Sequence, residues 1–184
     1  MEEIKRKKPE LLAPAGDFEC LVTAMNAGAD AVYFGLKEFN MRARAKNFYL
    51  KDLPKIKRLC RELYKDKEKK GKEKKEVKRY LTLNTIIYDK ELSRVEEIIK
   101  KSKPYIHAII CSDIAIMQLC KKYKIPFHVS TQCSVSNLET AKFYKKLGAE
   151  RITLARELNL KQIKKIAEKI PVEIFIHGAM CVSI

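Results

Sequence analysis

The chain has 184 residues, 46% of them hydrophobic, which is enough for one domain with a substantial core and too few for two large domains. No apolar run approaches the ~20 residues of a membrane-spanning helix, and the N-terminal segment MEEIKRKKPE lacks the apolar stretch of a secretory signal. We therefore expect a cytoplasmic protein.

The chain is strongly basic, with 39 lysine and arginine residues, 23 aspartate and glutamate residues and a formal net charge of +16. The lysine-rich stretch 65–76, which we expect to be a surface insertion, has seven lysines and four acidic residues and so contributes only +3. The positive charge is therefore spread along the chain, which favours a polyanionic partner such as RNA. A lysine-rich surface without that role explains the charge equally well.

The six cysteines form no CxxC pair, and most lie within apolar periodic segments. A disulfide framework in a small secreted protein would be denser in cysteine. We expect all except Cys181 to be reduced thiols in the core or at strand ends. The six are Cys20, Cys60, Cys111, Cys120, Cys133 and Cys181.

A short apolar strand, a polar turn and an amphipathic helix recur along the chain. Asp17, Asn137 and Asn159 are expected N-caps, and Gly28 and Gly148 follow helix ends. Strands are predicted at 10–16, 31–35, 79–87, 107–112, 126–131, 151–156 and 172–178. Helices are predicted at 17–28, from about 52, at 92–99, 113–123 and 137–148, and from 159.

This strict alternation predicts a parallel sheet with helical crossovers, and both doubly wound sheets and closed barrels fit it. No GxGxxG follows the first strand, which removes the main sign of a dinucleotide-binding sheet. Polar residues recur after every strand, as at the carboxyl-terminal face of a (β/α)8 TIM-type barrel. We therefore predict an incomplete barrel of that type, with about seven strands and six helices.

The polar strand ends supply the candidate binding residues. Helix capping explains Asp17, Asp113 and Ser130. Capping does not explain three arginines at one rim, and an anion-binding mouth does. The expected substrate-binding residues are Arg42, Arg44, Asn47, Asn84, Gln132, Arg156 and Glu157.

A closed barrel of this type has eight strands, so seven leave the first and last with unpaired edges. We therefore expect residues 1–184 to be the N-terminal part of a single barrel domain, with the remaining C-terminal portion of the same protein as a partner.

The sequence resembles the peptidase U32 family, the collagenase-like proteins, over nearly its whole length. The resemblance is carried by ELLAPAGD, AVYFG, NMRARAKNF, TLNTI, STQ, LARELNL and EIFIHGAMC. The last segment matches the family signature, and the chain ends before the next glycine and cysteine of that signature. The matching residues are Glu173, Phe175, Gly178, Ala179, Met180 and Cys181.

The resemblance implies an activity and a cofactor. Several family members are similar to RNA hydroxylases that act on the tRNA wobble uridine or on a ribosomal RNA cytidine, through prephenate-linked metabolism. In those members four cysteines bind a [4Fe–4S] cluster, and by match Cys181 would be the first ligand. One cysteine cannot hold a cluster, so in this chain by itself Cys181 is expected to be a lone thiol and the chain inactive.

Two further residues of the signature are candidate catalytic groups. His177 fits a general acid or base, a donor beside the cluster, or a packing residue. Glu173 is expected to face the barrel interior with Phe175 and His177, where its carboxylate needs a cationic partner such as Arg156 or a lysine. That internal ion pair is the structural alternative to catalysis.

Two other functions stay open. A cysteine peptidase would use Cys181 activated by His177, whereas the HExxH and GxSxG patterns of other hydrolases are absent. The chain could also be a catalytically inactive fragment.

Overall fold

The computed structural model describes residues 8–42, 45–68 and 76–178. Within them a single sheet contains seven strands, all parallel and hydrogen-bonded in the order in which they occur in the chain. Six α-helices alternate with the strands. The strands are β1 Leu12–Pro14, β2 Ala31–Gly35, β3 Lys78–Leu83, β4 Ala108–Cys111, β5 Phe127–Val129, β6 Arg151–Thr153 and β7 Val172–Glu173.

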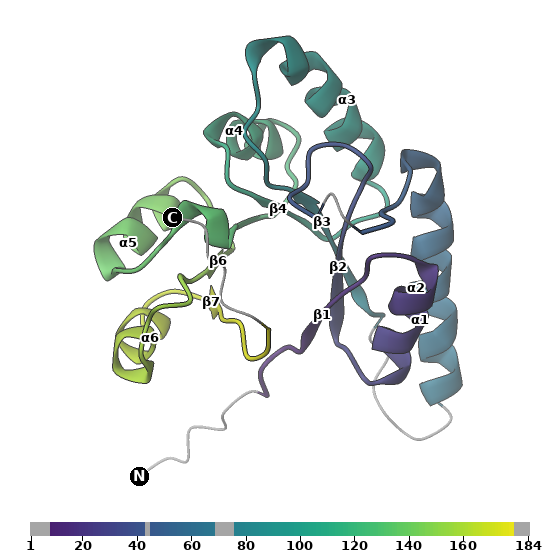
Figure 1. The fold of residues 1–184 in the computed structure, drawn as a ribbon, viewed down its shortest axis with the longest axis horizontal. Coiled ribbons are helices and arrows are strands. Elements are labelled where there is room, and N and C mark those ends of the chain that lie inside the picture. The colour runs from purple at the N-terminus through teal and green to yellow at the C-terminus, as the bar shows by residue number, and fades with distance from the viewer. Residues whose placement is uncertain (1–7, 43–44, 69–75, 179–184) are drawn as a thin grey trace.

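The sheet curves, and the helices lie around its convex side (Figure 1). β1 and β7 form the two edges and flank the open side. The fold is therefore the predicted incomplete (β/α)8 barrel. The helices are α1 Phe18–Asn26, α2 Leu53–Glu68, α3 Leu92–Ser102, α4 Ile114–Lys122, α5 Leu138–Lys146 and α6 Leu160–Ala167.

The predicted caps position the helices. Asp17, Asp113 and Asn137 each accept a backbone N–H of the first turn, of α1, α4 and α5 respectively. Asn159 caps α6 as predicted and forms a capping box with Gln162. Ser130 accepts a hydrogen bond from the backbone of Gln132, so it also serves as a cap.

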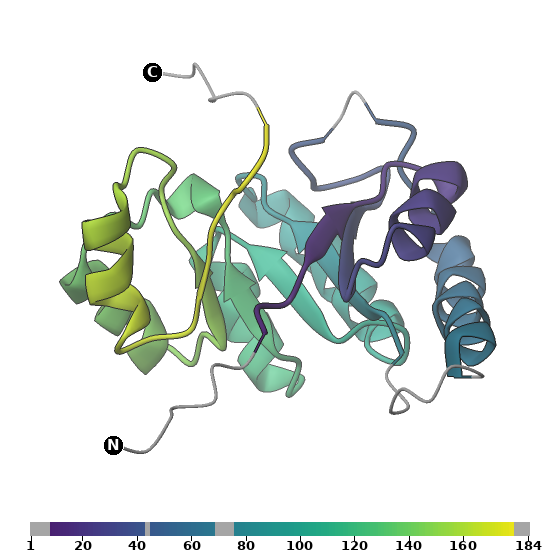
Figure 2. The same ribbon diagram turned by 90° about the horizontal axis from the view of Figure 1, so that it is seen from below.

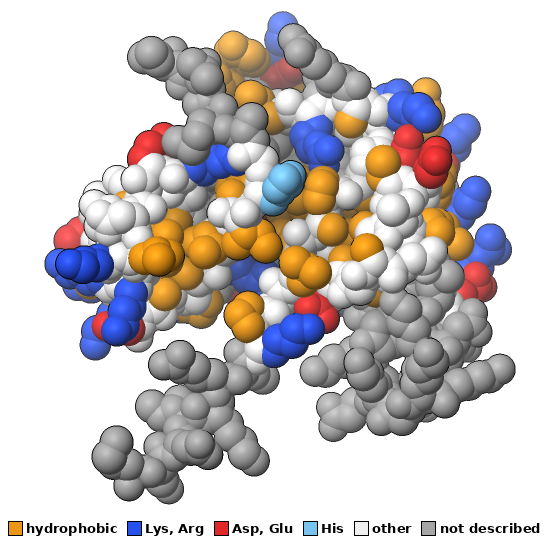
Figure 3. Space-filling view, turned by 60° about the horizontal axis from the view of Figure 1, so that its bottom comes forward, with side chains coloured by type: hydrophobic (Ala, Val, Ile, Leu, Met, Phe, Trp, Pro, Cys, Tyr) orange, Lys and Arg blue, Asp and Glu red, His pale blue; other side chains and the backbone are white. Residues whose placement is uncertain are grey.

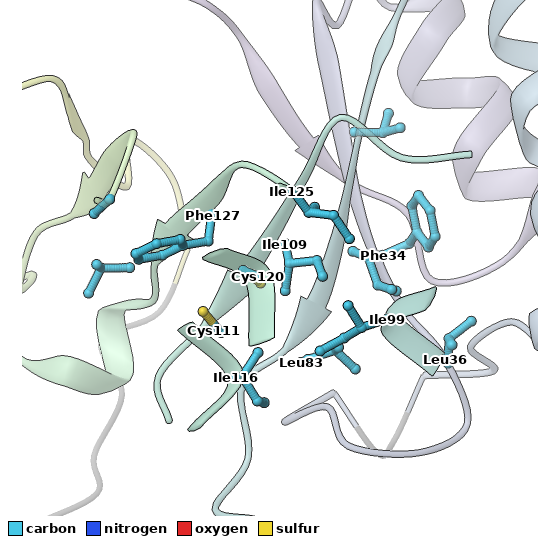
Figure 4. Close-up of a cluster of buried hydrophobic side chains, with 14 of the residues drawn as sticks. Phe34, Leu36, Leu83, Ile99, Ile109, Cys111, Ile116, Cys120, Ile125 and Phe127 are labelled. Atoms are coloured by element: carbon cyan, nitrogen blue, oxygen red, sulfur yellow. The ribbon is translucent and has the colours of Figure 1, made fainter. Parts of the chain in front are cut away.

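The outward face of the sheet carries the hydrophobic core. Side chains alternate along a strand, so Phe34, Leu83, Ile109 and Cys111 all point toward the helices. They pack against residues of α3 and α4 such as Ile99, Ile116 and Cys120, as Figure 4 shows. Cys60, Cys111 and Cys120 are buried free thiols, as predicted, but Cys20 is exposed on α1 and is not part of the core.

The inward face contains a smaller apolar cluster and many polar groups. Ala31, Tyr80, Ala108 and Ile110 form that cluster, with Tyr33 against it. Buried polar residues continue the same face on the later strands, including His128 and Thr153. On the open side hydrophobic side chains form a band across the surface (Figure 3).

All strands except β2 are shorter than predicted, and the carboxyl ends differ most in three of them. β3 ends at Leu83 rather than at residue 87, β6 at Thr153 rather than 156, and β7 at Glu173 rather than 178. Strand assignment requires a partner, and β7 pairs with β6 through only two residues of each strand. No helix in the described part of the chain is long and apolar enough to span a membrane.

Candidate functional site

The loop after β2 is anchored by a buried asparagine. Asn40 donates its side-chain amide to the carbonyl of Leu36, and its Oδ1 accepts the backbone N–H of Arg42 at 2.9 Å. The Asn40 amide lies directly on Gly35, where any Cβ would overlap it. Only glycine therefore fits at the end of β2, and Asn40 fixes the backbone that carries Arg42.

A second asparagine closes the same loop. The side chain of Asn47 donates to the carbonyls of Arg42 at 2.8 Å and Ala45 at 3.1 Å. Both Asn47 and Phe39 have positive φ, 51° and 59°, a conformation that L-residues rarely adopt. Such strain gathers at binding and catalytic sites. The amide nitrogen of Asn47, a residue predicted to bind substrate, shapes the loop, while its Oδ1 is buried without a partner among the described residues.

Two arginines at this end of the sheet each lie over an aromatic ring. The guanidinium of Arg42 is 5.3 Å from the ring centre of Tyr33, and that of Arg156 is 4.6 Å from the ring centre of Phe175. Nη2 of Arg156 also approaches Gly178, where a Cβ would be only 3.2 Å away. Cation–π contact holds both guanidinium planes in place.

One nitrogen of Arg42 lacks a partner. Its Nη1 is buried and forms no hydrogen bond with any described residue. A buried charged donor without an acceptor is costly, and an anion beside it would remove that cost. The geometry thus favours an anionic group next to Arg42, in line with the predicted anion-binding mouth.

Tyr33 lies close to three charged side chains, those of Arg42, Arg156 and Glu173. Burial raises the pKa of the Tyr33 phenol, the positive charges of Arg42 and Arg156 work in the opposite direction, and Glu173 adds to the rise. Both arginines and the carboxylate therefore lie close enough to act on one phenol. This group of Tyr33, Arg42, Arg156 and Glu173 is called the mouth below.

Glu173 faces the interior, as predicted, but its partner is a different one. Its Oε1 accepts the hydroxyl of Thr153 at 3.1 Å, and its Oε2 lies 3.7 Å from Nη1 of Arg151. The cation is therefore Arg151, not Arg156 or a lysine. Burial raises the pKa of Glu173, while Thr153 and Arg151 oppose that rise.

Arg151 connects Glu173 to a second, partly buried carboxylate, that of Glu10. Its Nη1 is 2.6 Å from Oε1 of Glu10, which also accepts the hydroxyl of Tyr80 at 2.8 Å, while Lys78 reaches Oε2 at 2.6 Å. Burial disfavours the ionised form of Glu10, but these three donors outweigh it and lower its pKa to about 2. Arg151 thus links the residues before β1 to β7 across the open barrel.

The remaining predicted residues lie apart from the mouth or outside the described range. The side chain of Asn84 contacts Ser130 Oγ at 3.4 Å and accepts the N–H of Met41 at 3.2 Å, so it connects two rim loops. Gln132, Glu157 and His177 are exposed. Arg44 and Cys181 lie outside the described residues, and no role can be assigned to them from the structure.

The described residues do not supply a metal site. Among them no group of three or more histidine, cysteine, aspartate or glutamate side chains could hold a metal ion. Their cysteines are either buried in the core outside the barrel or dispersed on the helices and loops. The donor set of a four-cysteine cluster is therefore not found in this part of the chain.

Sequence reasoning missed Tyr33, Asn40 as an anchor, and the Arg151–Glu10 pair. The signal for the pair was present: Glu10 and Arg151 are charged residues at the starts of otherwise apolar strands. Such charges are buried only when they are paired. Tyr33 lies between Val32 and Phe34, and the alternation of strand side chains placed it on the inward face.

Comparison with known proteins identifies relatives of this chain. Residues 16–184 match the model of peptidase family U32. The chain is 45% identical over 183 residues to an uncharacterized protease of Methanocaldococcus jannaschii, covering 95% of this chain and 42% of the relative. It is 40% identical over 190 residues to a collagenase of Porphyromonas gingivalis, covering 95% and 43%.

A third relative carries a name that refers to RNA. The chain is 36% identical over 182 residues to tRNA hydroxylation protein P1 of Bacillus subtilis, covering 96% of this chain and 40% of the relative. This chain thus spans less than half the length of each of the three. Among solved structures, the U32 peptidase Mk0906 superposes with a TM-score of 0.68 at 14% identity, covering 95% of this chain and 70% of that one, which supports the fold.

Proposed function

Because the chain belongs to peptidase family U32, we propose that it provides the barrel of an RNA hydroxylation enzyme of the cytoplasm. The observation that carries the proposal is the buried, unpartnered Nη1 of Arg42 beside Tyr33. A relative named for tRNA hydroxylation supports RNA as the substrate class.

The chemistry of the mouth suits a nucleotide displaced from its stack. Arginine binds phosphate through its planar set of donors, and RNA-binding sites stack unpaired bases on aromatic rings or on guanidinium planes. Two such pairs are present, Arg42 with Tyr33 in the mouth and Arg156 of the mouth with the neighbouring Phe175. We assign phosphate binding to the arginines and base stacking to the two aromatic–guanidinium pairs.

Glu173 and His177 are the proposed proton-transfer groups. Burial raises the pKa of Glu173, which brings the carboxyl closer to the range in which it can hold and release a proton near neutral pH. His177 is exposed on the segment that follows β7, at the same end of the sheet as the arginines. The [4Fe–4S] cluster with Cys181 as a ligand, and a prephenate-linked co-substrate, remain part of the proposal and rest on the family resemblance.

The test is deletion of the gene that encodes this chain, followed by mass spectrometry of tRNA and ribosomal RNA nucleosides. We expect a 5-hydroxylated pyrimidine to disappear and to return on complementation with the wild-type gene. Complementation with Arg42→Gln should restore at most a tenth of it, whereas Arg58→Gln, at an exposed arginine of α2, should restore it fully. Unchanged nucleosides after deletion would refute the proposal.

A peptidase is the second candidate, favoured by the relative named collagenase. Incubation of the purified protein with gelatin tests it. Cleavage by the wild type that is lost in Cys181→Ala would favour a cysteine peptidase over an RNA hydroxylase.

A further inference from the structure

The last turn of each helix from α3 to α6 contains two lysines. The last turns of α4 and α5 contain Lys121 and Lys122, and Lys145 and Lys146, whereas the last turn of α1 has no basic residue. These helix ends lie near the starts of the strands, at the opposite end of the sheet from the mouth (Figure 2). The lysine patch is defined here as Lys121, Lys124, Lys145 and Lys146.

The members of the patch come from two turns that touch each other. A Cβ on Gly148 would lie 3.9 Å from Cδ of Lys121, so the stem of that lysine passes over the turn that ends α5. The backbone N–H of Gly148 bonds to the carbonyl of Lys145 at 3.0 Å, and that of Lys124 to the carbonyl of Lys121 at 3.1 Å. Both turns are therefore fixed by backbone hydrogen bonds.

The charge of the patch is not neutralised. None of its four lysines forms an ion pair with a residue in the described part of the chain. At the end of α3, by contrast, Lys101 lies 2.6 Å from Glu97, and Lys122 of α4 turns toward Glu96 at 2.9 Å.

The helix dipole alone does not explain this difference. It favours lysine at any helix end, whether or not the lysine has an acidic partner. Glu150 follows the patch in the sequence, and Lys146 is close enough to help lower the pKa of Glu139, so these two carboxylates oppose four lysines and leave a net positive charge. The two turns therefore present a surface with a net positive charge.

We propose that the lysine patch binds the phosphate backbone of the RNA, away from the mouth that receives the nucleoside. This inference rests on the proposed function for its choice of polyanion. The length of the sheet separates the lysine patch from the mouth. From Phe127 to Ser130, along β5, the chain advances only about 10 Å, so one RNA that passes round the outside of the barrel can contact both the patch and the mouth. Such contacts add affinity without reading sequence.

The test is the binding of fluorescein-labelled bulk tRNA to the full chain, measured by anisotropy at several salt concentrations. In the patch variant all four lysines are replaced by glutamine. The matched control removes the same charge near the other end of the sheet, through Lys37→Gln, Lys51→Gln, Lys55→Gln and Lys90→Gln. Each lysine that contacts a phosphate of a single strand contributes about 0.7 to the magnitude of the slope of log K against log salt, so loss of four contacts should reduce that magnitude by about three in the patch variant.

Each outcome decides the inference. A smaller slope and at least tenfold weaker binding in the patch variant, with the control close to wild type, would support it. Equal losses in both variants, unchanged binding in the patch variant or no tRNA binding by the wild type would overturn it. Binding of the wild type to vesicles with 30% phosphatidylglycerol but not to tRNA would assign the patch to a membrane surface instead.

The inference and the proposed function can fail separately. If tRNA binding depends on the patch but deletion of the gene leaves all hydroxylated nucleosides in place, the patch stands and the hydroxylase proposal falls. If deletion removes the nucleoside but the patch variant binds tRNA like wild type, only the patch is refuted.

Discussion

The two faces of the sheet differ in chemistry, and they divide folding from function between them. The outward face packs side chains such as Phe34, Leu81 and Ile109 against the helices, and all three are fully buried. The inward face holds Tyr80 and His128 beside the charged residues Arg151 and Glu173. The hydrophobic face fixes the architecture, and the polar face contains the candidate site.

The two faces also differ in how far apart in the sequence their interacting residues lie. Outward residues pack against a neighbouring helix and need only be apolar and of suitable size. Inward charges need one particular partner: Glu10 is 141 residues from Arg151, and the two are joined at 2.6 Å. Loss of one partner on the inward face therefore leaves a particular charge unpaired, whereas loss of one side chain on the outward face is shared among many packing neighbours.

The largest expected effect is a truncation on the outward face. Phe34 is fully buried and packs edge-on against Phe48, with ring centres 5.6 Å apart. Phe34→Ala should lower the free energy of unfolding by about 3–5 kcal/mol, because it opens a cavity in the core. Denaturant titration followed by circular dichroism measures this.

Its matched control is the adjacent residue on the other face. Tyr33→Ala removes a ring of similar size from a half-buried position, so we expect a loss of about half as much. Equal losses would show that the inward face is packed as tightly as the core. If Phe34→Ala does not fold, Phe34→Leu provides the milder comparison.

The outward face was largely predictable from sequence, whereas the inward face was not. The alternation of apolar strands and capped helices, with Asp17 and Asn159 as caps, predicted the layers correctly. The partner of Glu173 was predicted wrongly as Arg156 or a lysine. The residue of β6 that lies opposite Glu173 depends on the register of β6 and β7. In the observed register Thr153 pairs with Glu173, and Arg151, two residues before Thr153, lies on the same inward face.

The rim loop marks a second limit of sequence reasoning. Asn40, Arg42 and Asn47 are all polar and all follow β2, and residue type alone does not separate an anchor from a binding group. The distinction came from hydrogen bonds: Asn40 uses both ends of its amide within the loop, and Asn47 donates its amide nitrogen there, whereas Nη1 of Arg42 and Oδ1 of Asn47 are buried without a partner among the described residues. Cys181 lies outside the described residues, so its role stays a prediction.

The next largest effect should follow removal of the cation on the inward face. Arg151→Met leaves Glu10 and Glu173 without their shared arginine, and breaking such a pair should cost about 3 kcal/mol at pH 7. Lys78→Met, which removes a half-exposed partner of Glu10, should cost less than about 1 kcal/mol.

Acid should narrow the difference in stability between the wild type and Arg151→Met. The pKa of Glu10 is about 2 in the folded wild type and higher when unfolded, so its stabilisation is complete above pH 4.5 and is lost as the pH falls toward 2. Without Arg151 the pKa of Glu10 rises, so the variant should lose less on acidification. The free energies of unfolding of the wild type and Arg151→Met should therefore converge between pH 7 and pH 2.5. A constant difference over this range would contradict the assigned ion pair.

The smallest expected change in stability is at Glu173. Burial raises the pKa of its carboxyl, so folding favours the protonated form, and wild-type stability gains from this residue as the pH falls through the raised pKa toward 4.5. At pH 7 Glu173→Gln removes a buried charge, while Arg151 retains its ion pair with Glu10. The free energy of unfolding should therefore change by less than about 1 kcal/mol, in either direction. The same variant should fail to restore the hydroxylated nucleoside in the deletion strain. A stable but inactive variant would assign Glu173 to proton transfer, whereas a loss of several kcal/mol would show that its ion pair with Arg151 serves the fold and would explain any loss of activity without chemistry.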